Sequence, residues 1–385
     1  MLFTHRSLSF EERQILDRVA EMRHELRHFV VQQPRRWSGL LARMTRARAL
    51  RASNSIEGIN VSFDDAIAAI DGEDPEDADR PTWRAVEGYH AAMDFVLQRC
   101  RDNSFVFSQD MVLAVHFMIC QYDLNANPGN YRPGWVGVRN SESGEVVHEG
   151  VDRDHLEALM AELIDYMNDR DVESVVLKAA MVHLNLAMLH PFSDGNGRTA
   201  RCLQTAVLAN EGIVAPIFSS IEEYIGRNQQ AYYDVLAEVG GGGWHPDRNC
   251  QPWIRFCITG HYRQAGTLLR RMREAERVYD DLQNLVKRAG LHERTSLALL
   301  QAAFSGRVRN ASYRVSADIS NNLASRDLRA LVDAELLVPE GERRGRHYMP
   351  SVQVAELRQR HRLPRGIDDP FKDGAAAIAQ RNLFE

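Results

Sequence analysis

Residues 190–201 read HPFSDGNGRTAR and bring together side chains suited to work on a phosphate group. A histidine titrates near neutral pH, so His190 is suited to accept a proton from a hydroxyl group. Asp194 supplies a carboxylate. Proteins commonly bind Mg²⁺ through one or two carboxylates together with oxygens of a bound phosphate. Arg198 and Arg201 stand three positions apart on one helical face and offer two guanidinium forks to phosphate oxygens.

The small residues of the same segment predict room for a ligand. A helix predicted over residues 197–210 begins inside the motif, so its free N–H groups and positive dipole end face His190. Gly195 and Gly197 let the backbone approach a ligand that a Cβ atom would keep away. Asn196 has an amide to donate to a phosphate oxygen. The segment therefore predicts a polyphosphate site with the apparatus for nucleotidyl or phosphoryl transfer.

A helix–loop–helix with a glycine-rich turn and solvent-facing arginines is the simpler alternative. The GNG triplet by itself is more typical of such a turn than of a binding site. A base, a metal ligand, an anion cradle and two arginines within one turn favour the phosphate site.

The elements around the motif are predominantly helical by their spacing. Apolar residues from Val175 to Leu189 recur at helical intervals and predict a buried helix that ends at His190. The acidic, proline-containing stretch at 72–81 predicts a surface loop. WVGV and EVVH flank the polar turn NSESG and predict a β-hairpin. Helices are predicted within residues 10–70, 83–99, 108–122, 155–168, 172–189, 197–210 and 264–288.

The motif resembles the signature of the Fic family, HPFx[DE]GNGRxxR, which is complete at residues 190–201. Members typically transfer AMP from ATP to a Ser, Thr or Tyr hydroxyl of a protein. The resemblance implies ATP and Mg²⁺, a protein target and self-modification, with His190 as general base, Asp194 as metal ligand and Phe192 as a buried anchor. It assigns the phosphates to Gly195, Asn196, Gly197, Arg198 and Arg201. The Doc-type branch, which phosphorylates its target, has alanine and lysine in this loop, so the two glycines favour AMP transfer.

Two further segments extend the resemblance. The hairpin at 136–147 lies where the family has a flap that pairs with the target backbone by strand addition. The family often has Pro-Pro after this strand, whereas this chain has His148-Glu149-Gly150. NQQAYY resembles the adenine-side segment, which implies nucleotide contacts for Asn228, Tyr232 and Tyr233. The alternative is that the two tyrosines are packing residues.

SNSIEGIN matches the inhibitory motif of the family, [ST]xxxE[GN], through Ser53, Glu57 and Gly58. Taken alone, a glutamate followed by glycine is more typical of a helix end. The resemblance implies a Glu57 carboxylate paired with Arg201, where the γ-phosphate belongs, and hence self-inhibition. In some members the same glutamate supports removal of AMP.

The C-terminal part resembles a winged helix-turn-helix. Helices are predicted at 296–304, 315–320 and 325–334, followed by two strands around a Gly/Arg turn at 336–349. Arg343, Arg344 and Arg346 in this wing are suited to contact DNA phosphates. A solvated hairpin and a protein-interaction module are the alternatives.

The expected fold is therefore mainly α, with a Fic helical core and a β-hairpin flap. The predicted divisions are an N-terminal helical region with the inhibitory helix (1–107), the Fic core (108–262), a connector helix (263–290), the winged helix-turn-helix (291–351) and a tail (352–385).

The composition indicates the cellular compartment of the protein and the partners that its surface can bind. The net charge is -6, so nucleic-acid contact has to be local. Five cysteines form no CxxC pair and indicate a reducing compartment. The N-terminus reaches charged residues before any apolar core, unlike a secretory signal, and the most apolar run is about half of the ~20 residues that a membrane span needs. We expect a cytoplasmic protein without membrane contact, and a homodimer by family resemblance.

The leading hypothesis is a self-inhibited protein adenylyltransferase. A transcription regulator that senses nucleotide through the Fic core and acts through the winged helix is the second. An enzyme that removes AMP from a modified protein is the third.

Overall fold

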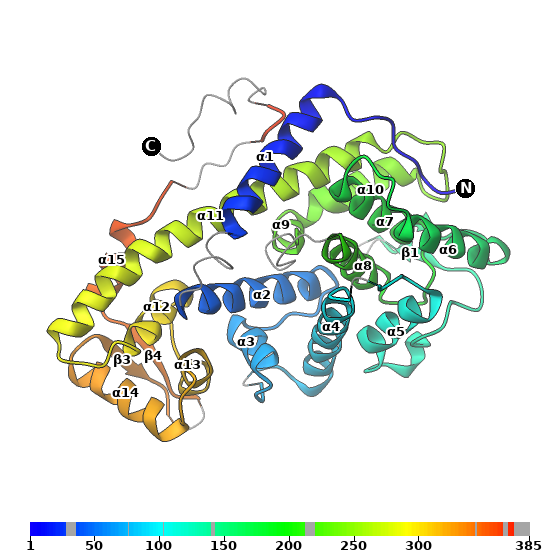
Figure 1. Cartoon of the computed structure of the whole chain (residues 1–385). Coiled ribbons are helices and arrows are strands. Elements are labelled where there is room, and N and C mark those ends of the chain that lie inside the picture. Colours follow the sequence, from blue (N-terminus) through cyan, green and yellow to red (C-terminus); the bar gives the residue numbers. More distant parts are fainter. Residues whose placement is uncertain are drawn as a thin grey trace.

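The computed structural model describes residues 1–27, 36–75, 77–102, 104–139, 143–211, 220–342, 345–364 and 369–372. Within these residues the chain is built from helices, and the only sheets are two antiparallel pairs of strands (Figure 1). The mainly α fold predicted from the sequence is confirmed. No helix in these ranges combines the length and apolar character that crossing a membrane requires.

Helix α7 (Val175–Leu189) forms the centre of the molecule because nearly all of its side chains are buried. A helix that is apolar on every side has to be surrounded by other elements. Helix α8 (Asn196–Asn210) packs along α7, and α6 (Arg153–Asn168) also packs against α7. Helices α4 (Arg80–Arg99) and α5 (Gln109–Cys120) cover α8, and a short 3₁₀ turn (Leu124–Ala126) follows α5.

Helix α4 begins inside the stretch that the sequence predicted as a loop. Asp79 caps it by accepting a hydrogen bond from the Thr82 N–H, and Pro81 occupies its first turn. Proline is tolerated there because the first N–H groups of a helix have no internal partner. The predicted loop is therefore shorter than expected.

Helix α11 (Gln251–Arg288) is one continuous helix of 38 residues and runs through the boundary predicted between residues 262 and 263. Its apolar residues continue as a narrow buried stripe past that point (Leu268, Met272, Ala275, Val278, Leu282 and Val286). Helix α11 packs on α1 (Phe10–Arg27) and, further along, on α12 (Thr295–Ser305) and α15 (Val352–Arg360) of the C-terminal part (Figure 1).

The inhibitory segment predicted from the sequence ends helix α2 (Arg36–Ile56), which crosses between the helices around α7 and α8 and the C-terminal part (Figure 1). It packs on α9 (Glu222–Arg227), on α3 (Phe63–Asp71) and on α4. Helix α10 (Gln229–Gly240) follows α9 directly, and neither helix was predicted from the sequence.

The predicted hairpin is present as strands β1 (Gly137–Arg139) and β2 (Val146–Glu149). They are antiparallel, with Val138 opposite His148 and Gly137 opposite Glu149, and the register shifts after Val138.

The C-terminal part has three helices and a second hairpin, in the predicted order. These are α12 (Thr295–Ser305), α13 (Asn310–Ala317), α14 (Asn321–Asp333), β3 (Leu337–Glu340) and β4 (His347–Pro350), followed by α15 (Val352–Arg360). Helix α13 begins five residues earlier than predicted and stops before Asp318, which has a left-handed φ of 53°. Arg343 and Arg344 lie outside the described residues, whereas Arg346 is exposed.

Candidate active site

Two residues of the loop between α7 and α8, His190 and Gly195, have a left-handed backbone conformation. His190 ends α7 with a left-handed φ of 50°, and its N–H donates to the Leu186 carbonyl at 3.0 Å. Gly195 starts α8 with a φ of 77°, and a Cβ atom there would collide with the Cys120 sulfur. Glycine is required at this position for both reasons.

Asn196 shapes this loop with its side chain. Its Oδ1 accepts the Phe192 N–H at 2.9 Å, and its Nδ2 donates to the Phe192 carbonyl at 2.8 Å. The side chain is buried, so both amide groups serve the loop itself. What remains for a ligand is the backbone N–H group of the first α8 turn, whereas the sequence analysis expected the side chain to donate.

His116 of α5 supports the same loop and was not identified from the sequence. Its ring stacks on Phe192, with centroids 3.7 Å apart. Its Nδ1 accepts the Gly129 N–H at 3.0 Å, so its Nε2 carries the proton and donates to the Asp194 carbonyl, also at 3.0 Å. Burial lowers the pKa of His116 to about 4, consistent with this neutral form.

The His190 imidazole is set up as a base. Its Nδ1 lies 3.3 Å from the Ala187 carbonyl oxygen, which can only accept, so Nδ1 carries the proton and Nε2 keeps its lone pair. Burial lowers the pKa of His190 to about 4. The ring is therefore neutral at physiological pH.

Asp194 and Arg198 lie at the start of α8. The Asp194 carboxylate is exposed, and its Oδ2 lies 3.3 Å from Arg198 Nη2. Arg198 is buried, also donates to the Tyr122 hydroxyl at 3.1 Å, and leaves its Nε and Nη1 without a partner in the described residues. Buried donors without partners are costly, so this side chain suits an anion.

The described residues contain no group of three or more His, Cys, Asp or Glu side chains able to hold a metal ion. A lone exposed carboxylate at Asp194 still fits Mg²⁺, because this ion keeps several waters and commonly takes its remaining ligands from a bound polyphosphate.

The structure brings the predicted inhibitory residues to the motif. Arg201 is buried, and its Nε donates to Ser53 Oγ at 2.8 Å, while its Nη2 donates to the Ser53 carbonyl at 2.9 Å and to Glu57 Oε1 at 2.7 Å. Burial opposes the charge of Arg201, but the Glu57 carboxylate, together with the nearby Tyr232 and Tyr89, raises the pKa of the guanidinium. Gly58 turns the chain away with a φ of 76°.

Glu57 also occupies the amino end of α8. A Cβ atom on Gly197 would collide with Glu57 Oε1, so this carboxylate lies directly against the first helical turn. The Glu57 side chain therefore takes both groups that the sequence analysis reserved for phosphates, the helix N-terminus and the Arg201 fork.

The segment NQQAYY has mixed placements. The Tyr232 hydroxyl is buried 3.0 Å from His183 Nε2, and Asn228 Nδ2 donates to the Tyr224 carbonyl at 2.8 Å. Tyr233 is partly exposed, and its hydroxyl donates to the Ile56 carbonyl at 2.9 Å. Gln229 Nε2 donates to the same carbonyl at 3.1 Å. Two side chains of α10 thus hold the end of α2, next to Glu57.

Arg132 joins the flap to the motif and was also missed. Its side chain is 2% exposed, and its Nε donates to the His190 carbonyl at 2.9 Å. Its Nη1 and Nη2 donate to the carbonyls of Gly134 and Val151, which flank the hairpin. On β2, His148 Nε2 donates to the Met188 carbonyl at 2.9 Å. The flap is therefore tied to the end of α7 at several points.

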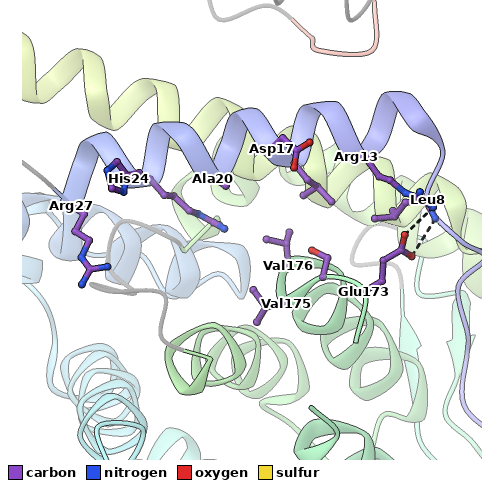
Figure 2. A pocket seen from close by; sticks show the side chains of 12 residues that line it. Leu8, Arg13, Asp17, Ala20, His24, Arg27, Glu173, Val175 and Val176 are labelled. Carbon is purple, nitrogen blue, oxygen red and sulfur yellow. Dashed lines mark hydrogen bonds and ion pairs between the residues drawn. The ribbon is translucent and has the colours of Figure 1, made fainter. Parts of the chain in front are cut away.

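A separate cavity of about 550 Å³ lies between α1 and the start of α7 (Figure 2). Arg13, His24, Glu173 and Val176 are among its lining residues, and none of the twelve belongs to residues 190–201. The cavity is therefore distinct from the phosphate loop.

Residues 106–208 match the model of the Fic/DOC family, and this segment encloses the flap, α7, the motif and most of α8. The chain therefore carries a Fic domain, and the resemblance drawn from the motif is confirmed.

Curated relatives agree with this assignment. The chain is 27% identical over 173 residues to the protein adenylyltransferase Fic of Nematostella vectensis, covering 44% of this chain and 36% of that protein. It is 30% identical over 100 residues to the protein adenylyltransferase fic-1 of Caenorhabditis elegans, covering 25% and 20%. The chain thus spans between a fifth and about a third of the length of these relatives.

A crystal structure of a Fic family protein from Desulfovibrio desulfuricans G20 is similar over 90% of this chain and 98% of that chain. Its TM-score is 0.59 and its sequence identity 20%, so the likeness is one of fold. Because it covers nearly the whole chain, the shared fold extends well beyond the Fic domain.

Proposed function

We propose that this chain is a self-inhibited protein adenylyltransferase, which transfers AMP from ATP to a Ser, Thr or Tyr hydroxyl of a protein, itself included. The observation that carries the proposal is the position of the Glu57 carboxylate. This carboxylate lies against the amino end of α8 and accepts a hydrogen bond from Arg201. The neutral imidazole of His190 belongs to the loop just before α8. An anion already occupies the place where a triphosphate would bind.

The transfer reaction follows from the groups around this place. The target hydroxyl oxygen forms a bond to the α-phosphorus of ATP, and the bond from that phosphorus to the pyrophosphate oxygen breaks. His190 Nε2 takes the hydroxyl proton. The N–H groups of the first α8 turn, with Arg198 and Arg201, stabilise the phosphate charges. Mg²⁺, when bound at Asp194, supplies further positive charge to the phosphate oxygens.

Inhibition follows from competition for the same partners. Arg201 Nη2 already donates hydrogen bonds to Glu57 and to the Ser53 carbonyl, so the outer phosphates of ATP have to displace the Glu57 carboxylate. Two negative groups at one helix end repel each other, and ATP binds productively only after Glu57 has moved away.

The flap is proposed to receive the target. Val146 and Val147 of β2 are 37% and 42% exposed, and strand addition to a hairpin edge supplies main-chain hydrogen bonds to an extended peptide. Arg132 and His148 hold this hairpin close to His190, so a peptide paired with it brings its hydroxyl toward the base. The five free cysteines suit a reducing compartment such as the cytoplasm.

Transfer of label from ATP carrying ³²P at the α-position tests the proposal. We expect little self-labelling of the wild type, strong labelling of Glu57→Gly, and an intermediate level for Glu57→Gln, which keeps the shape of the side chain without its charge. His190→Ala in the Glu57→Gly background removes the label. Equal labelling of wild type and Glu57→Gly would refute self-inhibition, and undiminished labelling without His190 would refute its role as base.

A further inference from the structure

Helix α14 presents a continuous polar face to the solvent. Its exposed side chains at three- and four-residue intervals are Asn321, Asn322, Ser325, Arg326 and Arg329, which we call the α14 face. Neither arginine forms an ion pair with a carboxylate within the part of the chain that the structure describes. The face therefore carries two positive charges that form no salt bridge in these residues, among short hydrogen-bonding side chains.

The rest of the C-terminal part holds this helix rigidly. Ala324, Leu328 and Leu331 are buried on the opposite side of α14. Asp327 accepts from Arg294 Nε at 2.7 Å and from the Tyr313 hydroxyl at 2.9 Å. The exposed face is thus presented in a fixed orientation.

The contact with α13 fixes the approach to α14. Asn310 of α13 donates to Ser325 Oγ at 2.9 Å, and Ser320 caps the start of α14. Figure 1 places α14 and the β3–β4 hairpin at one end of the molecule, away from α5 and α6. The α14 face is therefore the outer face of the second helix of a helix-turn-helix.

The chemistry of the α14 face identifies its partner. Asparagine amides match the edge of adenine, and arginine forks match the edge of guanine, in the major groove of B-form DNA. A protein interface would have aromatic or aliphatic anchors at its centre, and this face has none. The major groove of A-form RNA is too narrow for a helix. We propose that the α14 face binds the major groove of double-stranded DNA, with the exposed Arg346 of the hairpin contacting the phosphates.

Fluorescence anisotropy with a labelled duplex of about three helical turns and mixed sequence tests this proposal. We expect salt-sensitive binding by the full chain. The double variant Arg326→Ala and Arg329→Ala should bind at least tenfold more weakly, because two contacts to base edges are lost. The matched control removes two exposed arginines elsewhere, Arg84→Ala and Arg101→Ala, and should bind like wild type.

Three results would overturn the proposal: no binding to the duplex, equal binding by wild type and the α14 variant, or an equal loss in the control. Binding of a protein through the α14 face, without duplex binding, would also overturn it.

A second and independent observation concerns the contacts between the C-terminal part and α2, the helix that leads to Glu57. Arg43 of α2 donates from Nη1 to Ser316 Oγ at 2.7 Å and from Nη2 to the Ser312 carbonyl at 3.1 Å, both in α13. Asp64 of α3 pairs with Arg307.

Further contacts extend the same junction. Asp64 also lies 3.7 Å from Arg309, and Glu73, just after α3, pairs with Arg314 of α13. Arg43 is in addition paired with Asp71 at 3.4 Å. The junction between α13, α2 and α3 is thus rich in charged contacts.

Helix α2 connects this junction to the active site. Arg43 and Glu57 are 14 positions apart, or about 20 Å along a helix, and the helix runs without interruption to Ile56. A shift at α13 therefore displaces Glu57. We infer that the C-terminal part sets how firmly Glu57 stays on Arg201; this inference rests on the proposed function.

Weakening the junction without touching the site tests the inference. Arg43→Met and, separately, Asp64→Asn should tighten ATP binding and raise self-labelling several-fold above wild type, but not to the level of Glu57→Gly. In the Glu57→Gly background neither substitution should add anything. Arg18→Ala, which removes an exposed ion pair on α1, serves as control and should match wild type.

The outcomes separate the two claims. An inactive Glu57→Gly variant would defeat the proposed function itself. An active Glu57→Gly variant, with Arg43→Met and Asp64→Asn both indistinguishable from wild type, would defeat the coupling alone.

Discussion

At the scale of single residues, the protonation state of His190 is the feature on which the chemistry turns. A base has to be neutral, and burial keeps this imidazole neutral to about pH 4, whereas an unperturbed histidine protonates near pH 6.5. Because the pKa is lowered in the folded state, the same burial costs stability as the pH falls from about 6.5 toward 4.

The pH profile of Glu57→Gly follows from this shift. We expect kcat/KM for AMP transfer, which reports on the free enzyme, to stay level below pH 6.5 and to fall only toward pH 4. Initial rates from pH 4.5 to 8, with circular dichroism at each pH to confirm folding, measure it. A decline centred near pH 6.5 in folded protein would show that His190 titrates as an ordinary histidine.

Arg132 acts on the reaction through other groups, as a positioning residue. Arg132→Lys keeps a charge but loses the fork that binds the carbonyls of His190, Gly134 and Val151. In the Glu57→Gly background we expect kcat to fall by about 10- to 100-fold, as for a misplaced reacting group, with ATP affinity within about twofold. Labelling rates and ATP titration separate the two quantities. A parallel loss of ATP affinity would indicate a general loss of structure instead.

At the scale of elements, the end of α2 meets the start of α10 beside the phosphate loop. Tyr233 and Gln229 both donate to the Ile56 carbonyl, one residue before Glu57. The segment that the sequence analysis assigned to adenine therefore also holds the inhibitory helix in place.

Tyr233→Phe removes one of these hydrogen bonds and keeps the ring. A neutral hydrogen bond contributes about 0.5–1.5 kcal/mol, so we expect self-labelling to rise roughly two- to tenfold over wild type. In Glu57→Gly the same substitution should leave labelling unchanged. A drop in ATP affinity in that background would instead show that the Tyr233 hydroxyl contacts the nucleotide.

The site residues that the sequence predicts lie next to one another in the chain, whereas those that it does not predict bind backbone groups. The motif is recognisable because its base, carboxylate, glycines and arginines are adjacent in the chain. His116 and Arg132 act on backbone carbonyls 78 and 58 positions away, and a carbonyl accepts from any donor. No spacing in the sequence marks such contacts. The Asn196 side chain binds backbone groups too, those of Phe192 four positions away, and the residue type does not reveal this partner.

The predicted elements show a similar limit. Helices with broad apolar faces, such as α7, were placed nearly correctly, since burial follows directly from their pattern. Helix α11 was divided because its apolar content falls, although a narrow stripe continues through it. Helix α13 starts five residues before the predicted range of 315–320; Tyr313, which precedes that range, is buried, whereas Val315 is 44% exposed.

At the scale of the whole molecule, α11 and α2 both span from the Fic core to the C-terminal part (Figure 1). Ligand binding at the phosphate loop is therefore expected to stabilise more of the chain than the loop itself. Any ligand that binds only the folded state stabilises it, by about 2.7 kcal/mol at 100 times its Kd.

Thermal unfolding with ATP and Mg²⁺ reports this linkage without requiring catalysis. We expect ATP to raise the Tm of Glu57→Gly clearly and that of wild type little, because Glu57 holds the groups that bind the outer phosphates. AMP, which lacks those phosphates, should act equally on both proteins. Equal shifts with ATP would show that Glu57 does not compete with the nucleotide.

The central claim is that a triphosphate binds at the amino end of α8 with its α-phosphorus within reach of a hydroxyl deprotonated by His190. Intact-protein mass spectrometry of Glu57→Gly after incubation with ATP and Mg²⁺ tests it most directly. The account predicts a mass increase of one or more AMP groups, absent from Glu57→Gly with His190→Ala. A phosphoryl-sized increase, or an unchanged mass in folded protein that binds ATP, would contradict it.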